Sequence, residues 1–215
     1  MSRFTSYGTC VLCGKRTTKA GMSRHLKSCL AEHEPSRGKV ARLFRMRIED
    51  AYSPIFWMDV EMRANSTLEK LDDFLRREWL ECCGHLSDFD IDGINYSVTT
   101  SYEMGPLSVF ADPTDRTMKV KLGEILRKGS RFQHTYDFGT STELKLRVVD
   151  ERQGRIGRES VRLLSQNEAP AGSVRFAVKT QVGSAPSACT NVRTPSIASF
   201  TQKTTTVTSR RCCFP

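Results

Sequence analysis

Four residues near the start of the chain have the types and spacing of a metal site: Cys10, Cys13, His25 and Cys29. Two residues separate Cys10 from Cys13, which fits a tight turn that points both sulfurs at one ion. His25 and Cys29 stand four apart and so share one face of a helix. Three thiolates and one imidazole complete a tetrahedral Zn²⁺ shell, and the pattern therefore predicts one structural zinc ion. The alternative is a set of ordinary reduced cysteines, and the spacing favours zinc.

This segment resembles a zinc finger of the C2HC type, and Met22 matches the core position three residues before the histidine. Thr17 stands where a large apolar residue is usual, so we expect a weak core. The resemblance places Thr18, Gly21 and Arg24 at the base-facing positions of the helix, and Gly21 offers no side chain. Only Arg24 is left to contact a guanine, so sequence-specific recognition and a basic finger that docks or binds phosphate nonspecifically both stay open.

The charge of the chain changes along its length. Residues 1–47 hold 11 Lys and Arg against 2 Asp and Glu, residues 48–150 hold 12 against 19, and residues 151–215 hold 10 against 3. An acidic middle between basic ends predicts that nucleic acid is contacted by the ends and a protein partner by the middle. The predicted nucleic-acid-binding residues of the finger are Lys15, Arg16, Lys19, Arg24 and Lys27.

Several acid and base residues in the middle of the chain could support catalysis. Three carboxylates spaced by two would share one face of a strand and could hold a hard cation. The same alternation is expected on the solvent-exposed face of a β-hairpin, and we favour this interpretation over a cation site. Cys82 and Cys83 adjoin a histidine at the end of a predicted helix, where packing is the commoner role. We expect no enzyme, and the alternative is a hydrolytic or metal-dependent enzyme that uses Asp88, Asp90, Asp92, His85 or His134.

The middle of the chain has the patterns of a mixed α+β domain. Residues 65–84 predict an amphipathic helix, because apolar side chains recur at helical spacing up to a glycine. Asp92-Gly93 between two alternating runs predicts a hairpin, because both turn residues must accept a positive φ. Alternation of apolar and polar residues predicts half-buried strands over residues 40–50 and 55–63, and further strands are expected over residues 131–139, 142–151 and 160–165.

These patterns divide the chain into four parts. We expect a small mixed sheet with one main amphipathic helix, and a disordered tail that is basic, rich in Ser and Thr, and free of Asp and Glu. The absence of an 18-residue apolar run and of a secretory leader predicts a soluble, cytoplasmic protein that does not enter a membrane. The predicted parts are a zinc finger over residues 1–32, a linker over 33–40, an α+β domain over 41–168 and the tail over 169–215.

Two segments, residues 74–97 and 131–151, resemble the plasmid pRiA4b ORF-3-like family, and the resemblance covers about residues 42–168. It implies a small α+β fold; members have been described as passenger proteins of plasmids and insertion elements, and no activity is established for the family. Many members have a polar Asp, Trp and His where this chain has Thr140, Thr142 and Leu144, which favours a non-catalytic role. The most specific elements are Gly84-His85-Leu86, Phe89 and Tyr136-Asp137-Phe138-Gly139.

The tail departs from what the resemblance implies. Relatives with an N-terminal finger often carry a second cysteine-rich ribbon at this point. Back-translation of residues 173–179 and 203–209 with a one-base offset can give such a ribbon, so we predict that the reading frame slips near Gly172. On this hypothesis the tail is an out-of-frame remnant. A nucleotide sequence that encodes no paired cysteines in a second frame would disprove the hypothesis.

The sequence as a whole predicts a non-enzymatic, zinc-binding adaptor or regulatory module in a plasmid or mobile-element context. Its finger is expected to contact nucleic acid, and its acidic domain is expected to contact a protein. A purely protein-binding regulator, in which the finger also contacts a polypeptide, is the other alternative to an enzyme.

Overall fold

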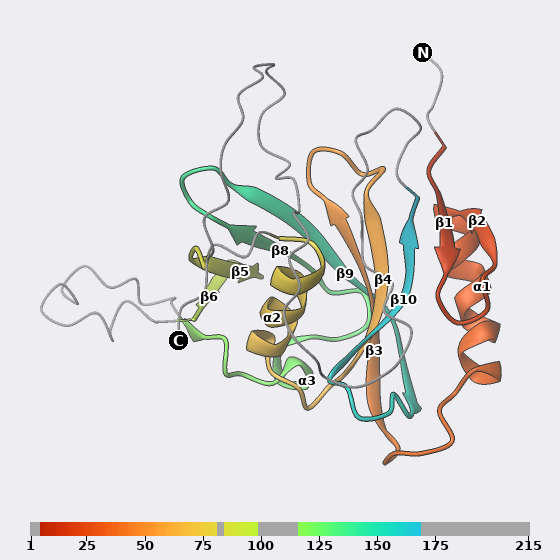
Figure 1. The fold of residues 1–215 in the computed structure, drawn as a ribbon. Coiled ribbons are helices and arrows are strands. Elements are labelled where there is room, and N and C mark those ends of the chain that lie inside the picture. Colours follow the sequence, from red (N-terminus) through yellow and green to blue (C-terminus); the bar gives the residue numbers. More distant parts are fainter. Residues whose placement is uncertain (1–4, 81–83, 99–115, 169–215) are drawn as a thin grey trace, which may run out of the picture.

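A mixed β-sheet of ten strands forms the body of the protein, whose computed structural model describes residues 5–80, 84–98 and 116–168 (Figure 1). The strand order is β2-β1-β10-β4-β3-β9-β8-β5-β6-β7, and neighbours are antiparallel except β6 and β7. The sheet is larger than the small one that we predicted, because the strands of the finger extend it at the edge formed by β10. The strands are β1 (Tyr7–Cys10), β2 (Arg16–Thr18), β3 (Ala41–Asp50), β4 (Trp57–Arg63), β5 (Ser87–Ile91), β6 (Ile94–Ser97), β7 (Arg116–Thr117), β8 (Arg131–Tyr136), β9 (Thr142–Gly154) and β10 (Val161–Asn167).

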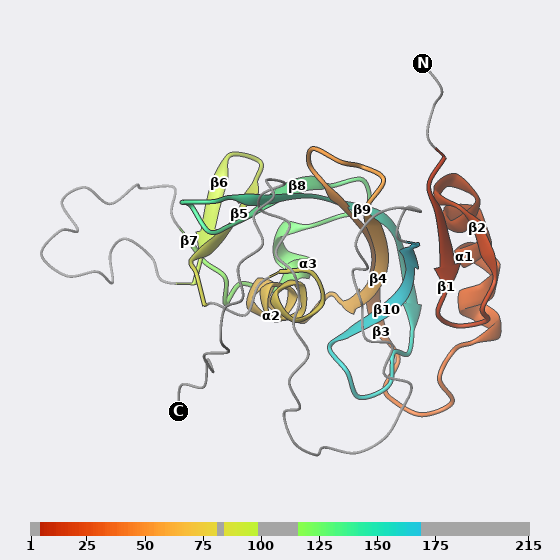
Figure 2. The same ribbon diagram turned by 45° about the horizontal axis from the view of Figure 1, so that its top comes forward.

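The sheet curves around two helices, α2 (Leu68–Glu78) and α3 (Leu122–Ile125), which lie against its inner face (Figure 2). The apolar stripe of α2 confirms the predicted amphipathic helix, although the helix ends at Glu78 rather than near residue 84. Its buried side chains pack on the apolar residues of the inner strands and form the main core. Each large apolar side chain in such a core contributes about 1.5–3 kcal/mol through burial. The buried apolar residues of α2 are Leu68, Leu71, Phe74 and Leu75.

The outer face of β3 and β4 is polar and yet buried. Arg45, Arg47, Asp59 and Glu61 alternate with the core residues along these strands, and each is at most 9% exposed. Our prediction of half-buried strands is therefore wrong for β4 and for most of β3. The reason is that helix α1 (Lys19–Glu32) of the finger lies over this face and excludes water from it.

The finger joins the sheet through the backbone of β1. This strand pairs with β10, with Gly8 opposite Asn167 and Cys10 opposite Ser165. A side chain at Gly8 would collide with the ring of Trp57, so glycine lets this ring lie directly on β1. The finger is thus bonded to the sheet edge by strand pairing as well as by its helix.

Residues 33–40, the predicted linker, have no regular structure, but contacts hold their first part in place. Glu34 accepts a hydrogen bond of 2.7 Å from the backbone amide of Arg155 and lies 3.4 Å from the guanidinium of Arg152. Arg162 donates to the carbonyl of His33 at 3.0 Å. The start of this segment is therefore bound to β9 and β10 rather than loose.

The predicted hairpin is confirmed. Strands β5 and β6 are antiparallel, and Asp92 and Gly93 form the turn with φ of 54° and 77°. The tail over residues 169–215 lies outside the described residues, so its disorder and the frame slip stay predictions. Within the described part of the chain, no helix is long and apolar enough to cross a membrane.

Candidate metal centre

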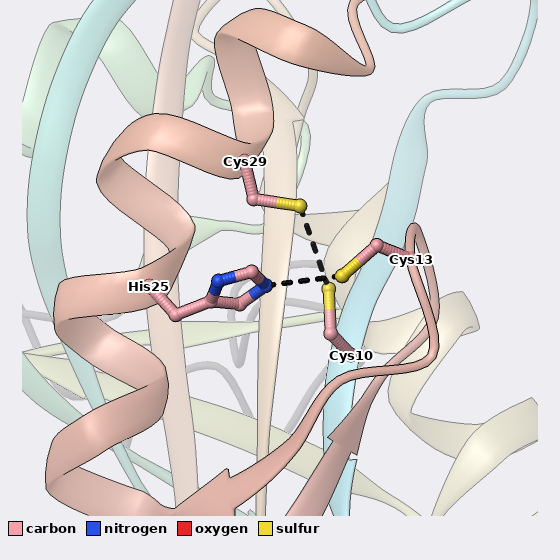
Figure 3. A group of neighbouring side chains, drawn as sticks. All are labelled: Cys10, Cys13, His25 and Cys29. Carbon is pink, nitrogen blue, oxygen red and sulfur yellow. Dashed lines mark hydrogen bonds between the residues drawn. The ribbon is translucent and has the colours of Figure 1, made fainter.

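The four predicted metal ligands meet in one group between the β1–β2 turn and helix α1 (Figure 3). Their ligand atoms all lie within 4.8 Å of one another. Sγ of Cys10 is 3.9 Å from Sγ of Cys29, and Sγ of Cys13 is 3.2 Å from Nε2 of His25. Metal–sulfur bonds of about 2.3 Å in a tetrahedron give sulfur–sulfur edges of about 3.8 Å, which these distances resemble. The group is therefore close enough to bind one metal ion.

Two local structures place the ligands. After Cys10 the chain turns back on itself: the amide of Gly14 donates to the carbonyl of Cys10, and Cys10 donates to the carbonyl of Lys15, both at 2.9 Å. Gly14 has a φ of +74°, which glycine adopts without strain. On the other side, Thr18 caps α1 by accepting a hydrogen bond from the amide of Gly21. The turn and the capped helix thus aim the two halves of the ligand set at each other.

The surroundings of the group favour the metal-binding form of Cys13 and His25 and disfavour that of Cys29. Burial disfavours the Cys13 thiolate, but hydrogen bonds from the Lys15 amide and the neighbouring thiols outweigh burial and lower the pKa of Cys13. Burial and the adjacent thiols raise the pKa of Cys29 to about 12. Burial and the charge of Lys15 lower the pKa of His25, which favours the neutral imidazole that binds metals. A metal ion would supply the positive charge that Cys29 needs to ionise.

The apolar core of the finger is shared with the sheet. Met22, Leu26 and Leu30 of α1 pack against Trp57 of β4 and Leu164 of β10, and all five are at most 3% exposed. The expected weak core at Thr17 is therefore compensated by residues that lie far away in the sequence. Cys10 and Cys29 belong to the same buried cluster as Trp57, so we expect changes at these two cysteines to disturb the packing around Trp57.

The acid and base residues of the alternative enzyme do not gather at one place. Asp88 and Asp90 lie on the outer face of β5, whereas His134 is fully buried on the inner face of β8. Burial raises the pKa of Asp88. Asp92 is in the hairpin turn, and the His85 ring lies 5.9 Å from that of Tyr136. Among the described residues these groups form no metal-sized cluster, and Cys82 and Cys83 lie outside that part of the chain.

The five basic residues predicted to contact nucleic acid fall into two groups. Arg16 and Lys19 form ion pairs with Glu168 at 2.7 Å and Glu49 at 2.9 Å. The remaining three are exposed, and no ion pair is formed by them within the described residues. Arg24 and Lys27 are three apart on α1, and Lys15 is on the turn between β1 and β2. Among the described residues of the finger, the cations without an ion pair are therefore Lys15, Arg24 and Lys27.

A buried polar network between α2 and the sheet was missed by the sequence analysis. Asp72 accepts hydrogen bonds from Nε of Arg76 at 2.6 Å, from Oγ of Ser87 at 2.8 Å and from Nε2 of His134 at 2.7 Å. The four-residue spacing of Asp72 and Arg76 on a helix indicates an ion pair in the sequence itself. His134 is distant in the sequence, and only the fold brings it to this pair. Burial opposes the charge of Asp72, and the bonds from His134 and Arg76 overcome it and lower its pKa.

We predict that Asp72→Asn destabilises the protein by about 2 kcal/mol at neutral pH, because a buried charged acceptor is lost. A carboxyl whose pKa is lowered by folding stabilises the protein above its ordinary pKa. This contribution disappears as the pH falls through the lowered value. The difference from the wild type should therefore shrink in acid, as measured by urea unfolding at neutral and acidic pH. Asp73→Asn, at the exposed neighbour, is the control, and an equal cost for both variants would contradict the role of the network.

Comparison with known proteins gives the class to which this fold belongs. The family described as plasmid pRiA4b ORF-3-like protein matches residues 42–174. The chain belongs to this family, as the resemblance predicted, and its four candidate metal ligands precede the matched residues. A search of curated proteins finds no match. The crystal structure of a protein of unknown function from Methanosarcina mazei Go1 is similar at 15% identity, over 60% of this chain and 70% of that chain, with a TM-score of 0.48.

Proposed function

We propose that the protein is a non-catalytic binding module that associates with nucleic acid and whose finger is held by one zinc ion. Three thiols and one imidazole are the donor set that zinc prefers in structural sites. The four ligand atoms lie within 4.8 Å of one another, and a tetrahedral zinc ion bound by all four would have no open position at which to activate water or substrate. The metal centre therefore serves to hold α1 on the sheet.

The observation that carries the nucleic-acid role is the pair Arg24 and Lys27. Both side chains are exposed on α1 and form no ion pair within the described residues, whereas Arg16 and Lys19 are neutralised by carboxylates. Cations that are three apart on a helix are neighbours on its surface and can contact the same polyanion. The docked helix thus presents a fixed pair of positive charges to phosphate.

Arg24→Gln combined with Lys27→Gln should weaken binding to duplex DNA. Each phosphate contact that is lost lowers the slope of log K against log salt concentration by about 0.9, so the slope should fall by about 2. Fluorescence anisotropy of a labelled duplex over a salt series measures this slope. Lys70→Gln combined with Arg77→Gln removes the same charge from α2 and is the matched control. A wild type that does not bind duplex, or two variants with the same slope, would contradict the proposal.

A second candidate function, a protein-binding regulator, is favoured by an exposed apolar pair. Leu86 and Phe138 are 64% and 55% exposed, and the segments that carry them are joined by a bond of 2.9 Å from the Asp137 amide to the Leu86 carbonyl. Co-purification after nuclease treatment should recover a protein that Leu86→Ser with Phe138→Ser loses. Tyr52→Ser, at an exposed aromatic residue elsewhere, should keep it. Recovery of the same protein by all variants would count against this role.

A further inference from the structure

A groove of about 870 Å³ lies beside helix α1 and is lined by residues of α1 and of the strands β3, β8 and β9. Arg24 and Lys27 of α1 stand at one side of it, and the sheet residues that line it include Arg45, Arg131 and Arg147. The finger and the family domain therefore both contribute to this groove. No prediction from the sequence placed a site there.

The strand register aligns three arginines across the outer face of the sheet. Arg147 of β9 lies directly opposite Arg47 of β3 on one side and directly opposite Arg131 of β8 on the other. Like charges at opposite positions of neighbouring strands destabilise a sheet. Arg47 is neutralised by Asp59, but Arg131 and Arg147 are exposed, and neither forms an ion pair among the described residues. Repulsion within this arginine row thus destabilises the free protein, and a bound anion would relieve the repulsion.

A buried donor faces the same groove. Arg45 is 3% exposed, and its Nη2 has no hydrogen-bond partner among the described residues, although a carboxylate oxygen of Asp150 lies 3.6 Å away. Two carboxylates along the groove are engaged by cations: Asp150 binds Lys128 at 2.7 Å, and Glu49 binds Lys19 at 2.9 Å. The third, Asp90, is exposed and accepts a hydrogen bond from the amide of Gly93, but the lysines and arginines of the lining outnumber the three carboxylates. The charge left to a ligand is therefore positive.

The lining of the groove also limits the class of ligand. Sites for single strands combine cations with exposed aromatic rings on which bases stack. Phe132 is the aromatic residue of the lining, and its side chain packs in the core at 4% exposure. Arginine forks match phosphate oxygens in two-point hydrogen bonds, and contacts of this kind carry no information about base sequence. These features fit the outside of a duplex, where phosphates are exposed and bases are stacked away.

We propose that this groove binds the sugar–phosphate backbone of duplex nucleic acid, with Arg131 and Arg147 on the sheet and Arg24 and Lys27 on the finger. The inference rests on the proposed nucleic-acid association and deepens it, because it assigns half of the contact to the family domain. Binding is then independent of base sequence and needs the finger docked on the sheet.

The test uses two double variants of the full-length, metal-loaded chain. The groove variant carries both Arg131→Gln and Arg147→Gln. The control variant carries both Arg77→Gln and Arg158→Gln, which removes two arginines outside the groove. Anisotropy is measured with two duplexes of unrelated sequence, a single strand of equal length and poly-glutamate as a competitor. We expect the groove variant to bind both duplexes about tenfold more weakly, with a salt slope lower by about 2, and the control to bind like the wild type. The melting temperature of the groove variant without DNA should be higher than that of the wild type, because the repulsion within the arginine row is relieved.

Several results would overturn the inference. If the groove variant binds duplex like the wild type while the Arg24 and Lys27 variant does not, the proposed function stands and the groove is not the site. If the wild type binds no duplex, both fail. Tighter binding of the single strand, or equal competition by poly-glutamate, would reject a duplex backbone as the ligand. A lower melting temperature would assign Arg131 and Arg147 a structural role instead.

Discussion

Removal of the metal, or the change Cys10→Ser, should release the finger from the sheet and expose Trp57 to water. Trp57 is fully buried between β1 and α1, and its indole Nε1 donates to Oγ of Ser6 at 2.8 Å. Structural zinc contributes about 10–16 kcal/mol to small fingers, which is comparable with the whole stability of an ordinary domain. The finger has little core of its own, so loss of the ion should undo its packing.

Tryptophan emission measures this release directly. In a Trp79→Phe background Trp57 is the only tryptophan, and its emission should shift to the red when a chelator is added or when Cys10 is changed. Cys189→Ser removes a thiol from outside the ligand group and should leave the emission as it is. Unchanged Trp57 emission after complete removal of the metal would show that the finger stays docked without it.

Asp59→Leu should cost about 4 kcal/mol of folding free energy. Asp59 is fully buried and accepts bonds from Nε and Nη2 of Arg47 at 3.0 and 2.7 Å and from Oγ of Ser165 at 2.9 Å. Loss of the carboxylate leaves the Arg47 guanidinium buried without its counter-charge, a change that typically costs 3–5 kcal/mol. Arg47 also donates to the carbonyl of Lys19 at 3.0 Å, so the finger should loosen at the same time.

Urea unfolding of matched variants separates charge from packing. Arg47→Met with Asp59→Leu removes both charges and should recover much of the stability that Asp59→Leu loses. Glu151→Gln breaks the pair with Arg42, whose side chains are 39% and 33% exposed, and should cost less than about 1 kcal/mol. Equal costs for Asp59→Leu and Glu151→Gln would contradict the conclusion that Arg47 and Asp59 form a buried ion pair under α1.

The features that the sequence predicts correctly depend on residues close together in the chain. The ligand group follows from a two-residue gap in a turn and a four-residue gap on a helix, and both halves lie within 20 residues. The apolar stripe of α2 and the Asp92-Gly93 turn are local patterns of the same kind. In each case backbone geometry fixes which side chains meet before the rest of the chain is considered.

The features that the sequence does not predict depend on contacts between distant segments. Arg47 and Asp59 have the alternation of a solvent-exposed face, and only the position of α1 shows that this face is buried. The arginine row requires the register of three strands, which places residues 47, 131 and 147 side by side. Register of this kind is set by the packing of the whole sheet rather than by any local pattern. Charge counts along the chain could not reveal the groove, because its cations come from both the basic finger and the acidic domain.

Elemental analysis of the purified full-length chain, paired with its native mass, tests most directly whether four side chains and one ion hold the finger in place. We predict one zinc ion per chain, and less than a tenth of an equivalent in Cys13→Ser, where the set of three thiolates and one imidazole is broken. Wild-type protein that contains no bound transition metal and yet keeps Trp57 buried would contradict the metal centre and the role of zinc in docking the finger.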